Sequence, residues 1–162
     1  MHLYLLRHGE AGKRSDLQDH ERPLTDHGSA QARSAGSVLL KVRAGIETVI
    51  SSPLIRARQT AEIVCMSLGI TGFEVSETLA PGADRRRLYA FLSSSSAATV
   101  LLVGHEPQMS ETVSELISGR PQCEVAMGTC TLARVDVEHP VGPGRGTLRF
   151  LLPQDLIEEL SR

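Results

Sequence analysis

The chain has 162 residues, with 17 Lys and Arg residues against 19 Asp and Glu residues and a formal net charge of −2. This balance gives no bias toward nucleic acid or an anionic membrane, and no apolar stretch approaches the roughly 18–20 residues of a membrane span, so neither is an expected partner. The length predicts a single domain over residues 1–162, and the lack of a signal-like segment before the first apolar run predicts a cytoplasmic protein.

Strand and helix signals alternate along the first half of the chain. The apolar run Leu3–Leu6 predicts a strand, residues 28–43 a helix, and Thr48–Ile50 a second strand. The apolar stripe of the first helix is expected to consist of Ala32, Ala35, Leu39 and Val42. Ser52-Pro53 is suited to the N-cap and first turn of the next helix, which is expected to end at Gly69.

The second half continues the alternation. A short helix is predicted over Asp84–Leu92, an apolar strand over Thr99–Val103, and a helix from Pro107. Two further strands are predicted over Thr131–Val137 and Thr147–Leu152. Repeated strand–helix units predict an α/β fold, with a mostly parallel central sheet, an antiparallel edge and helices on both faces, which is a three-layer α/β/α sandwich.

Three polar elements directly follow predicted strands: Arg7-His8, Ser51-Ser52 leading to Arg56, and Gly104-His105. Ligand sites of open α/β sheets gather at the carboxyl ends of the strands, so we expect these elements to meet there. Histidines and arginines around one pocket suit a dianionic, tetrahedral group such as phosphoryl, because arginine binds its oxygens as a fork. Neither a Walker-type phosphate loop nor a carboxylate cluster for magnesium is recognisable, so the expected nucleophile is a side chain, and histidine can carry phosphoryl covalently.

No metal or other cofactor is expected. Cys65, Cys123 and Cys130 are far apart and form no Cys-x-x-Cys pair, which predicts reduced thiols rather than disulfides or a thiolate zinc site. No carboxylate lies at ligand spacing from His2, His8 or His105, so a histidine zinc site is not expected either.

Four motifs together resemble the signature of the histidine phosphatase superfamily, which includes phosphoglycerate mutases and acid phosphatases. They are Arg7-His8-Gly9-Glu10, Arg22-Pro23-Leu24-Thr25 with Gly28 and Gln31-Ala32, Ser51-Ser52-Pro53-Leu54 with Arg56-Ala57 and Gln59-Thr60, and Gly104-His105-Glu106-Pro107. The resemblance extends from the first strand to about residue 119 and implies a phosphoglycerate mutase-like fold. Little insertion between the motifs, and the segment Leu79-Ala80-Pro81-Gly82, make the chain most similar to the SixA-type phosphohistidine phosphatases.

The resemblance implies roles for individual residues. His8 would be the phosphorylated nucleophile. The phosphoryl oxygens would be held by Arg7, Arg56 and His105. The nearby arginines are expected to disfavour the imidazolium form of His8, which keeps the ring neutral and able to attack.

A further arginine and a proton donor are also expected. Arg22 resembles a phosphate-pocket arginine of the SixA type, and its alternative is to close a loop against Asp16 or Asp19. Mutases and many phosphomonoesterases of the superfamily carry a glutamate after the second helix that protonates the leaving oxygen, and residues 77–84 lack that arrangement. The remaining candidates for a proton donor are Glu10, Glu77, Asp84 and Glu106.

A missing acid slows the departure of an alkoxide more than the departure of neutral imidazole from a protonated phosphohistidine. The sequence therefore predicts a metal-independent phosphatase that works through phospho-His8 on phosphohistidine in a protein, such as a phosphorelay carrier. The alternatives are a phosphatase for small phosphomonoesters or sugar phosphates and a phosphoryl-binding module without turnover. Arg85-Arg86-Arg87 is expected to be a solvated helix face, or alternatively a docking surface for an acidic protein.

Overall fold

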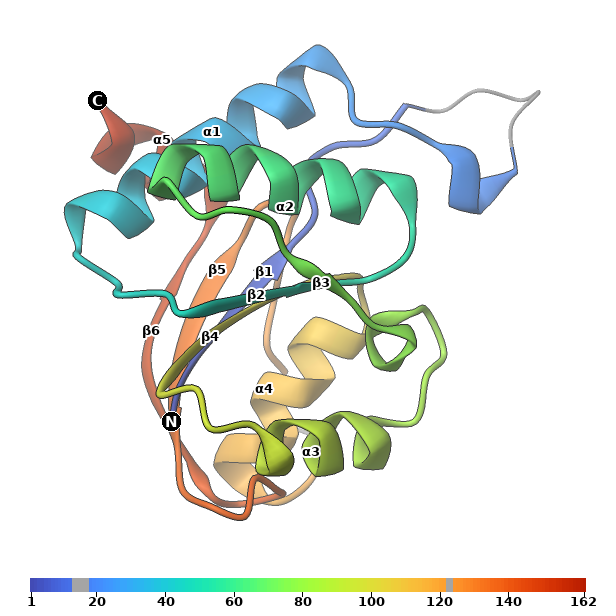
Figure 1. Cartoon of the computed structure of the whole chain (residues 1–162), viewed down its shortest axis with the longest axis vertical. Helices are drawn as coiled ribbons and strands as arrows, with labels where there is room; N and C mark the ends of the chain where they lie inside the picture. Colours follow the sequence, from blue (N-terminus) through green and yellow to red (C-terminus); the bar gives the residue numbers. More distant parts are fainter. Residues whose placement is uncertain (13–17, 122–123) are drawn as a thin grey trace.

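The computed structural model describes residues 1–12, 18–121 and 124–162, so Asp16 and Cys123 lie outside the described residues. Strands and helices alternate along the chain, except that the last two strands follow each other without a helix between them (Figure 1). The strands are β1 (His2–Arg7), β2 (Thr48–Ser51), β3 (Glu74–Val75), β4 (Thr99–Gly104), β5 (Leu132–Val137) and β6 (Gly146–Leu152). The helices are α1 (Asp26–Lys41), α2 (Ile55–Leu68), α3 (Arg85–Ser94), α4 (Gln108–Ser118) and α5 (Gln154–Ser161), with short 3-10 turns η1 (Asp19–Glu21) and η2 (Glu77–Leu79).

Among the described residues, six strands form one sheet in the order β3-β2-β4-β1-β5-β6. The first four of these strands run parallel, whereas β5 pairs antiparallel with both β1 and β6. The prediction of a mostly parallel sheet with an antiparallel edge is therefore confirmed. Because β1 and β4 lie inside the sheet and are covered on both faces, their sequences are continuous apolar runs rather than alternating ones.

Helices cover the two faces of the sheet, so the three-layer arrangement is also confirmed (Figure 1). Successive residues of a strand point to opposite faces. Leu3 and Leu5 of β1 accordingly pack in one buried cluster with residues of α3 and α4. Tyr4 and Leu6 pack in a second cluster with residues of α1, α2 and α5. This double burial fixes the position of β1 and of the residues that follow it.

Two local expectations were wrong, and one strand was not predicted. The helix expected to begin at Ser52-Pro53 begins at Ile55, because the Ser52 amide donates to the carbonyl of Val103 in β4 and keeps the chain extended. Val42 was expected on the apolar stripe of the first helix, but it is half exposed because α1 ends at Lys41, one residue before it. Strand β3 was not predicted, because its two residues are both exposed and carry no apolar pattern.

The predicted end of α2 at Gly69 is confirmed. Gly69 is the C-cap residue and has a φ of 69°, in the left-handed region that glycine adopts without steric cost. No helix in the described part of the chain combines the length and the apolar character that crossing a membrane requires.

Candidate active site

Strands β1, β4 and β2 end together at one edge of the sheet. They are parallel neighbours in matched register, with Arg7 paired to Gly104 and Ser51 paired to Val103. The residues just beyond these ends surround a cavity of about 420 Å³. All five residues expected at a phosphoryl site line it, namely Arg7, His8, Arg22, Arg56 and His105.

His8 is held in one tautomer by its two hydrogen bonds. Its Nδ1 lies 2.6 Å from the carbonyl oxygen of Gly9, which can only accept, so Nδ1 carries the proton. Its Nε2 lies 3.1 Å from Nε of Arg56, which can only donate. The lone pair of His8 is therefore on Nε2, at the side of the ring next to the buried arginine.

The imidazole of His8 is neutral near pH 7. Burial is the largest cause that lowers its pKa, to about 4, and the positive charges of Arg56, Arg7 and Arg22 act in the same direction. The hydrogen bond to the Gly9 carbonyl opposes this shift without cancelling it. The expected direction is confirmed, but burial contributes more than the arginines do.

His105 lies beside His8, with the two ring centroids 4.9 Å apart. Burial is again the largest cause that lowers its pKa, to about 3, followed by the charges of His8 and Arg56. Its Nε2 is 2.7 Å from Oγ of Ser52, the residue that Val103 holds in an extended conformation. Because Ser52 is extended and does not cap the helix, its hydroxyl lies next to His105 and orients the ring.

Two buried nitrogens in the site have no hydrogen-bond partner among the described residues: Nε of Arg7 and Nδ1 of His105. The Nη1 of Arg7 donates to the carbonyl of Met127 at 2.8 Å, which orients the guanidinium. A buried polar group without a hydrogen-bond partner costs free energy, so such groups are rare in native proteins. An anionic oxygen bound between Arg7 and His105 is the kind of group that would satisfy such atoms.

The loop that carries His8 lies directly against the N-terminus of α1. The amide of Glu10 donates to Oε1 of Gln31 at 2.8 Å, and the amide of Gly9 donates to Oγ1 of Thr60 at 3.1 Å. A Cβ on Gly28 would lie 2.0 Å from the carbonyl oxygen of Glu10, so only glycine permits this approach. Gly9 of the first motif and Gly28 of the second are therefore both required by the same close approach of two backbone segments.

The four candidate proton donors fall into two groups. Glu10 and Glu106 line the cavity, and each carboxylate accepts hydrogen bonds, from Thr25 and Ser110 respectively. Glu77 and Asp84 are not among the lining residues. Glu77 is exposed in η2. Asp84 caps α3 and pairs with Arg86.

Asp19 is a lining residue that the sequence reasoning did not assign to the site. Its Oδ2 accepts a hydrogen bond from Nη2 of Arg56 at 3.0 Å, and its Oδ1 accepts one from Nε of Arg22 at 3.0 Å. Arg22 thus both lines the cavity and closes the loop against Asp19, which combines the two alternatives considered for it. No sequence signal links Asp19 to Arg56, because the two residues are 37 positions apart.

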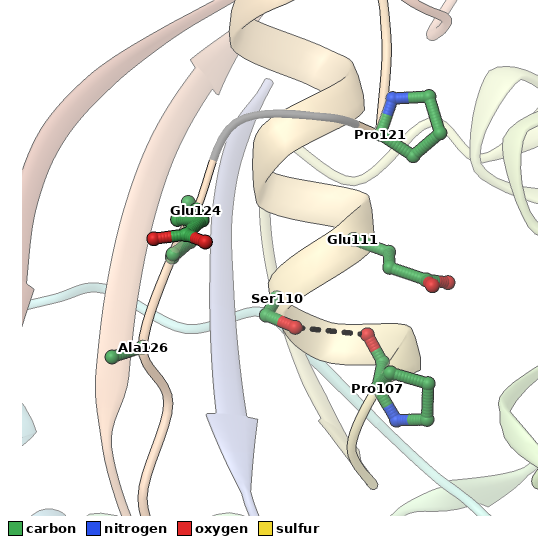
Figure 2. Close-up of a pocket in the computed structure, with 7 residues that line it drawn as sticks. Pro107, Ser110, Glu111, Pro121, Glu124 and Ala126 are labelled. Atoms are coloured by element: carbon green, nitrogen blue, oxygen red, sulfur yellow. Dashed lines mark hydrogen bonds between the residues drawn. The ribbon is translucent and has the colours of Figure 1, made fainter.

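A second cavity, of about 440 Å³, lies along α4 (Figure 2). Its lining comes from Pro107, Ser110 and Glu111 at the start of α4 and from Pro121 and Glu124–Ala126 in the segment after α4. Ser110 donates to the carbonyl of Pro107 at 3.0 Å, as the dashed line in Figure 2 marks. None of the histidines or arginines of the first cavity lines it.

The remaining expectations concern residues elsewhere in the fold. Within the described ranges, no group of three or more His, Cys, Asp or Glu side chains has a geometry suited to a metal ion. Cys65 and Cys130 are free and buried. Arg85 is not part of a purely solvated face, because it forms ion pairs with Glu111 and Glu115 of α4, whereas Arg86 is 89% exposed.

Comparison with known proteins agrees with this geometry. The family model of the histidine phosphatase superfamily (branch 1) matches residues 3–80. The phosphohistidine phosphatase SixA of Escherichia coli K12 is 34% identical, over 93% of this chain and 92% of that protein. A SixA homolog of Haemophilus influenzae is 29% identical, over 74% of this chain and 79% of that protein. A solved structure of the protein histidine phosphatase SixA complexed with tungstate superimposes with a TM-score of 0.86 and 30% identity, covering 96% of this chain and 98% of that one.

These similarities span nearly the whole chain and include the segment that builds the cavity. The phosphoglycerate mutase-like fold expected from the motifs is thereby confirmed. The chain belongs to the histidine phosphatase superfamily and is a SixA-like phosphatase.

Proposed function

We propose that this phosphatase removes phosphoryl groups from phosphohistidine in a protein, such as a phosphorelay carrier, through a phosphohistidine intermediate on His8. The observation that carries the proposal is the state of His8, a neutral imidazole whose Nε2 lone pair is next to the guanidinium of Arg56. A nucleophile needs that lone pair, and a transferring phosphoryl group needs the positive charge.

The reaction has two displacements at phosphorus. In the first, Nε2 of His8 forms a bond to phosphorus while the bond from phosphorus to the substrate imidazole breaks, and that imidazole leaves with the electron pair. In the second, water attacks phospho-His8, orthophosphate is released, and the lone pair returns to Nε2. The hydrogen bond from Nδ1 to the Gly9 carbonyl is compatible with every step, because Nδ1 remains protonated throughout.

We assign the binding of the phosphoryl oxygens to Arg7, Arg22, Arg56 and His105. Arg56 is 5% exposed in its side chain, so its charge acts in a poorly hydrated environment where it stabilises an anion more strongly than it would in water. The unpartnered Nε of Arg7 and Nδ1 of His105 support this assignment.

Charge around the cavity supports phosphohistidine as the substrate. Three arginines line the cavity, but three carboxylates, from Glu10, Asp19 and Glu106, also line it. Carboxylates disfavour a leaving group that carries further negative charge and tolerate an imidazole that is neutral or protonated. Many small phosphate esters are anionic beyond the phosphoryl group, so this lining discriminates against them.

Glu10 and Glu106 are the residues we propose as proton donors or acceptors for the leaving group and the attacking water. Both line the cavity, whereas Glu77 and Asp84 do not. Their presence is also the observation that favours the second candidate function, hydrolysis of small phosphomonoesters, because alkoxide departure needs an acid.

The phosphohistidine of a protein is a side chain on a folded surface, so a protein partner follows from the proposed substrate. We also propose the cytoplasm as the site of action. Cys65 and Cys130 are free thiols, which suits a reducing compartment.

The intermediate is tested by trapping. During turnover of a ³²P-labelled substrate, label is expected on His8 as an acid-labile, alkali-stable adduct, and His8→Ala is expected to lose both label and turnover while remaining folded. The matched control is His139→Ala, which removes an exposed histidine that follows β5. Label on a serine or an aspartate would refute the mechanism.

The substrate is tested by comparing kcat/KM for a phosphohistidine protein, an aryl phosphate and an alkyl phosphate under one condition. We expect that order of preference, because the three carboxylates of the cavity disfavour an anionic leaving group and tolerate imidazole. An alkoxide is the poorest leaving group and depends most on general acid catalysis, which is typically worth about 10²–10⁴-fold. If the alkyl ester is the best substrate, the small-molecule function replaces the one proposed. Glu10→Gln and Glu106→Gln, measured singly with that ester, then identify the acid.

A further inference from the structure

Asp19 is bound to the same guanidinium groups that we assign to the phosphoryl oxygens. Each of its carboxylate oxygens accepts a hydrogen bond from a different arginine, Oδ2 from Arg56 and Oδ1 from Arg22. Its main-chain carbonyl also accepts from Nη1 of Arg56 at 2.6 Å. A carboxylate between two arginines presents to them the same kind of paired anionic oxygens as a phosphoryl group does.

Arg56 connects Asp19 to the nucleophile. Its Nε donates to Nε2 of His8, while its Nη1 and Nη2 donate to Asp19. A phosphoryl group placed for attack by His8 must be close to this guanidinium. The group would then either take over the donor that the carboxylate occupies or lie close to a like charge, and both reduce its affinity.

The side chains of Asp19 and Arg56 differ in how easily each can move away from their ion pair. The side chain of Arg56 is 5% exposed and surrounded by protein, whereas the side chain of Asp19 is 63% exposed. An exposed carboxylate loses little when it exchanges an arginine for water, since ion pairs open to solvent are typically worth about 0–1 kcal/mol. Displacement therefore moves the carboxylate and leaves the arginines in position.

The carboxylate is also charged across the physiological range. Burial acts to raise the pKa of Asp19, but the hydrogen bonds from Arg22 and Arg56 outweigh it and hold the pKa below 3.8. A charged group is thus present at the arginines whenever the enzyme is folded and empty.

We propose that Asp19 is an internal ligand of the phosphoryl site, which competes with phosphoryl groups for Arg22 and Arg56 and so sets the affinity for substrate and for product orthophosphate. The proposal rests on the proposed function, because it takes these arginines as the phosphoryl-binding residues. A competing carboxylate weakens product binding, and this favours release of orthophosphate after phospho-His8 is hydrolysed.

The direct test is the Kd of inorganic orthophosphate by titration calorimetry, which requires no turnover. Asp19→Asn and Asp19→Ala are both expected to bind orthophosphate about three- to fivefold more tightly than the parent protein, which stays within the roughly 1 kcal/mol that an exposed ion pair is typically worth. Glu62→Gln is the control, since it removes one negative charge from the exposed face of α2 without contacting the cavity. It is expected to leave the Kd unchanged.

Turnover separates competition from a structural role. If Asp19 competes with phosphoryl, both variants lower the KM for an aryl phosphate and the Ki of orthophosphate together. If Asp19 mainly holds the two arginines in place, both constants rise and the Kd of orthophosphate weakens, which would overturn the proposal. An unchanged Kd in both variants, or no orthophosphate binding by any variant at millimolar concentration, also overturns it.

These outcomes are distinct from failure of the proposed function. If no label is found on His8 but Asp19→Asn still tightens orthophosphate binding, the mechanism is wrong while the competition by Asp19 stands. If His8 is labelled and orthophosphate binding is unaffected, only the inference about Asp19 fails.

Discussion

His8 is buried beside cationic side chains, and burial more than the neighbouring charge keeps its ring uncharged. A buried imidazole loses hydration on protonation, and three arginines add repulsion to that cost. The Gly9 carbonyl and Arg56 then determine which nitrogen carries the lone pair. Arginine alone was the expected cause, because sequence shows which charges are near a strand end but does not show how deeply the ring is buried.

The fork of Arg56, and not only its charge, is expected to matter for turnover. Arg56→Lys keeps a cation but loses the separate donors to His8 and to phosphoryl oxygens, so we expect kcat/KM for an aryl phosphate to fall by roughly 10²–10³-fold, as for loss of an oxyanion donor. Arg58→Lys is the control, because Arg58 is exposed on the same helix and does not line the cavity. A loss of less than threefold in Arg56→Lys would contradict the role assigned to the fork.

Chelators are expected to leave activity unchanged. The arginines lining the cavity repel a divalent cation, and no metal-ligating group of His, Cys, Asp and Glu is found among residues 1–12, 18–121 and 124–162. Turnover is to be measured after EDTA treatment and again after adding zinc or magnesium. Activity lost with EDTA and regained with either ion would show that a metal takes part.

At the scale of elements, the loop after β1 and the start of α1 act as one unit. A Cβ on Gly28 would lie 2.0 Å from the Glu10 carbonyl oxygen, and one on Gly9 would lie 2.5 Å from the Gly28 carbonyl oxygen. Both close contacts are to backbone, which cannot rotate away as a flexible side chain can. The nucleophile is thus positioned by packing between a loop and a helix that are adjacent in the chain.

Gly28→Ala is therefore expected to lower both stability and turnover. The added methyl group must push the loop carrying His8 away from α1, and overpacking of this kind typically costs about 1–3 kcal/mol. Urea unfolding and kcat/KM measure the two effects. Gly142→Ala is the matched control, because a Cβ there has no atom within 4 Å, and equal behaviour of the two variants would contradict the packing argument.

The sequence predicted those elements whose structure depends on local pattern. The apolar runs that become β1 and β4 are continuous because these strands are covered on both faces, so both were found. Strand β3 was missed because its two exposed residues show no apolar pattern and are a strand only through their backbone pairing with β2. Ser52 was misread as a helix cap because capping and extended serines look alike until the neighbouring strand is known.

The site was predicted to a similar extent. Arg7 is the last residue of β1, and His8 and His105 directly follow β1 and β4, so sheet topology requires these residues to meet. Asp19 was not recognised as part of the cavity because its contact with Arg56 joins a 3-10 turn to a helix, and no periodicity relates the two. Contacts between loops and distant elements depend on the completed fold, so they cannot be predicted from a local sequence pattern.

For the whole molecule, the buried histidines connect the active site to acid stability. The pKa values of His8 and His105 are lowered by burial to about 4 and about 3, below the 6.5 of an ordinary histidine. Between about pH 4 and 6.5 the unfolded chain therefore binds more protons at these two positions than the folded chain does. The free energy of unfolding must then rise with pH across this window, and the contribution is complete above pH 6.5.

Lowering the pH from 7 to 5 is accordingly expected to cost the protein about 1–2 kcal/mol of unfolding free energy for each buried histidine. The carboxyl groups of Asp19, Asp84 and Asp136 have pKa values held below 3.8, so they are ionised in both states at pH 5 and contribute nothing in this interval. The dependence on pH is therefore expected to come largely from the active site itself.

The measurement is urea unfolding at pH 7 and pH 5, in buffers free of phosphate so that no anion binds the cavity. We expect the double variant His8→Asn and His105→Asn to lose most of the difference between the two pH values, whatever its stability at pH 7. His139→Asn, which replaces an exposed histidine, is expected to keep that difference. If the double variant keeps it as well, the acid sensitivity arises elsewhere, and the two histidines are not held neutral at a cost to the fold. The burial that lowers the pKa of His8 keeps the imidazole uncharged at neutral pH, as the proposed mechanism requires. The same burial makes protonation of His8 favour unfolding, so the protein is less stable in acid.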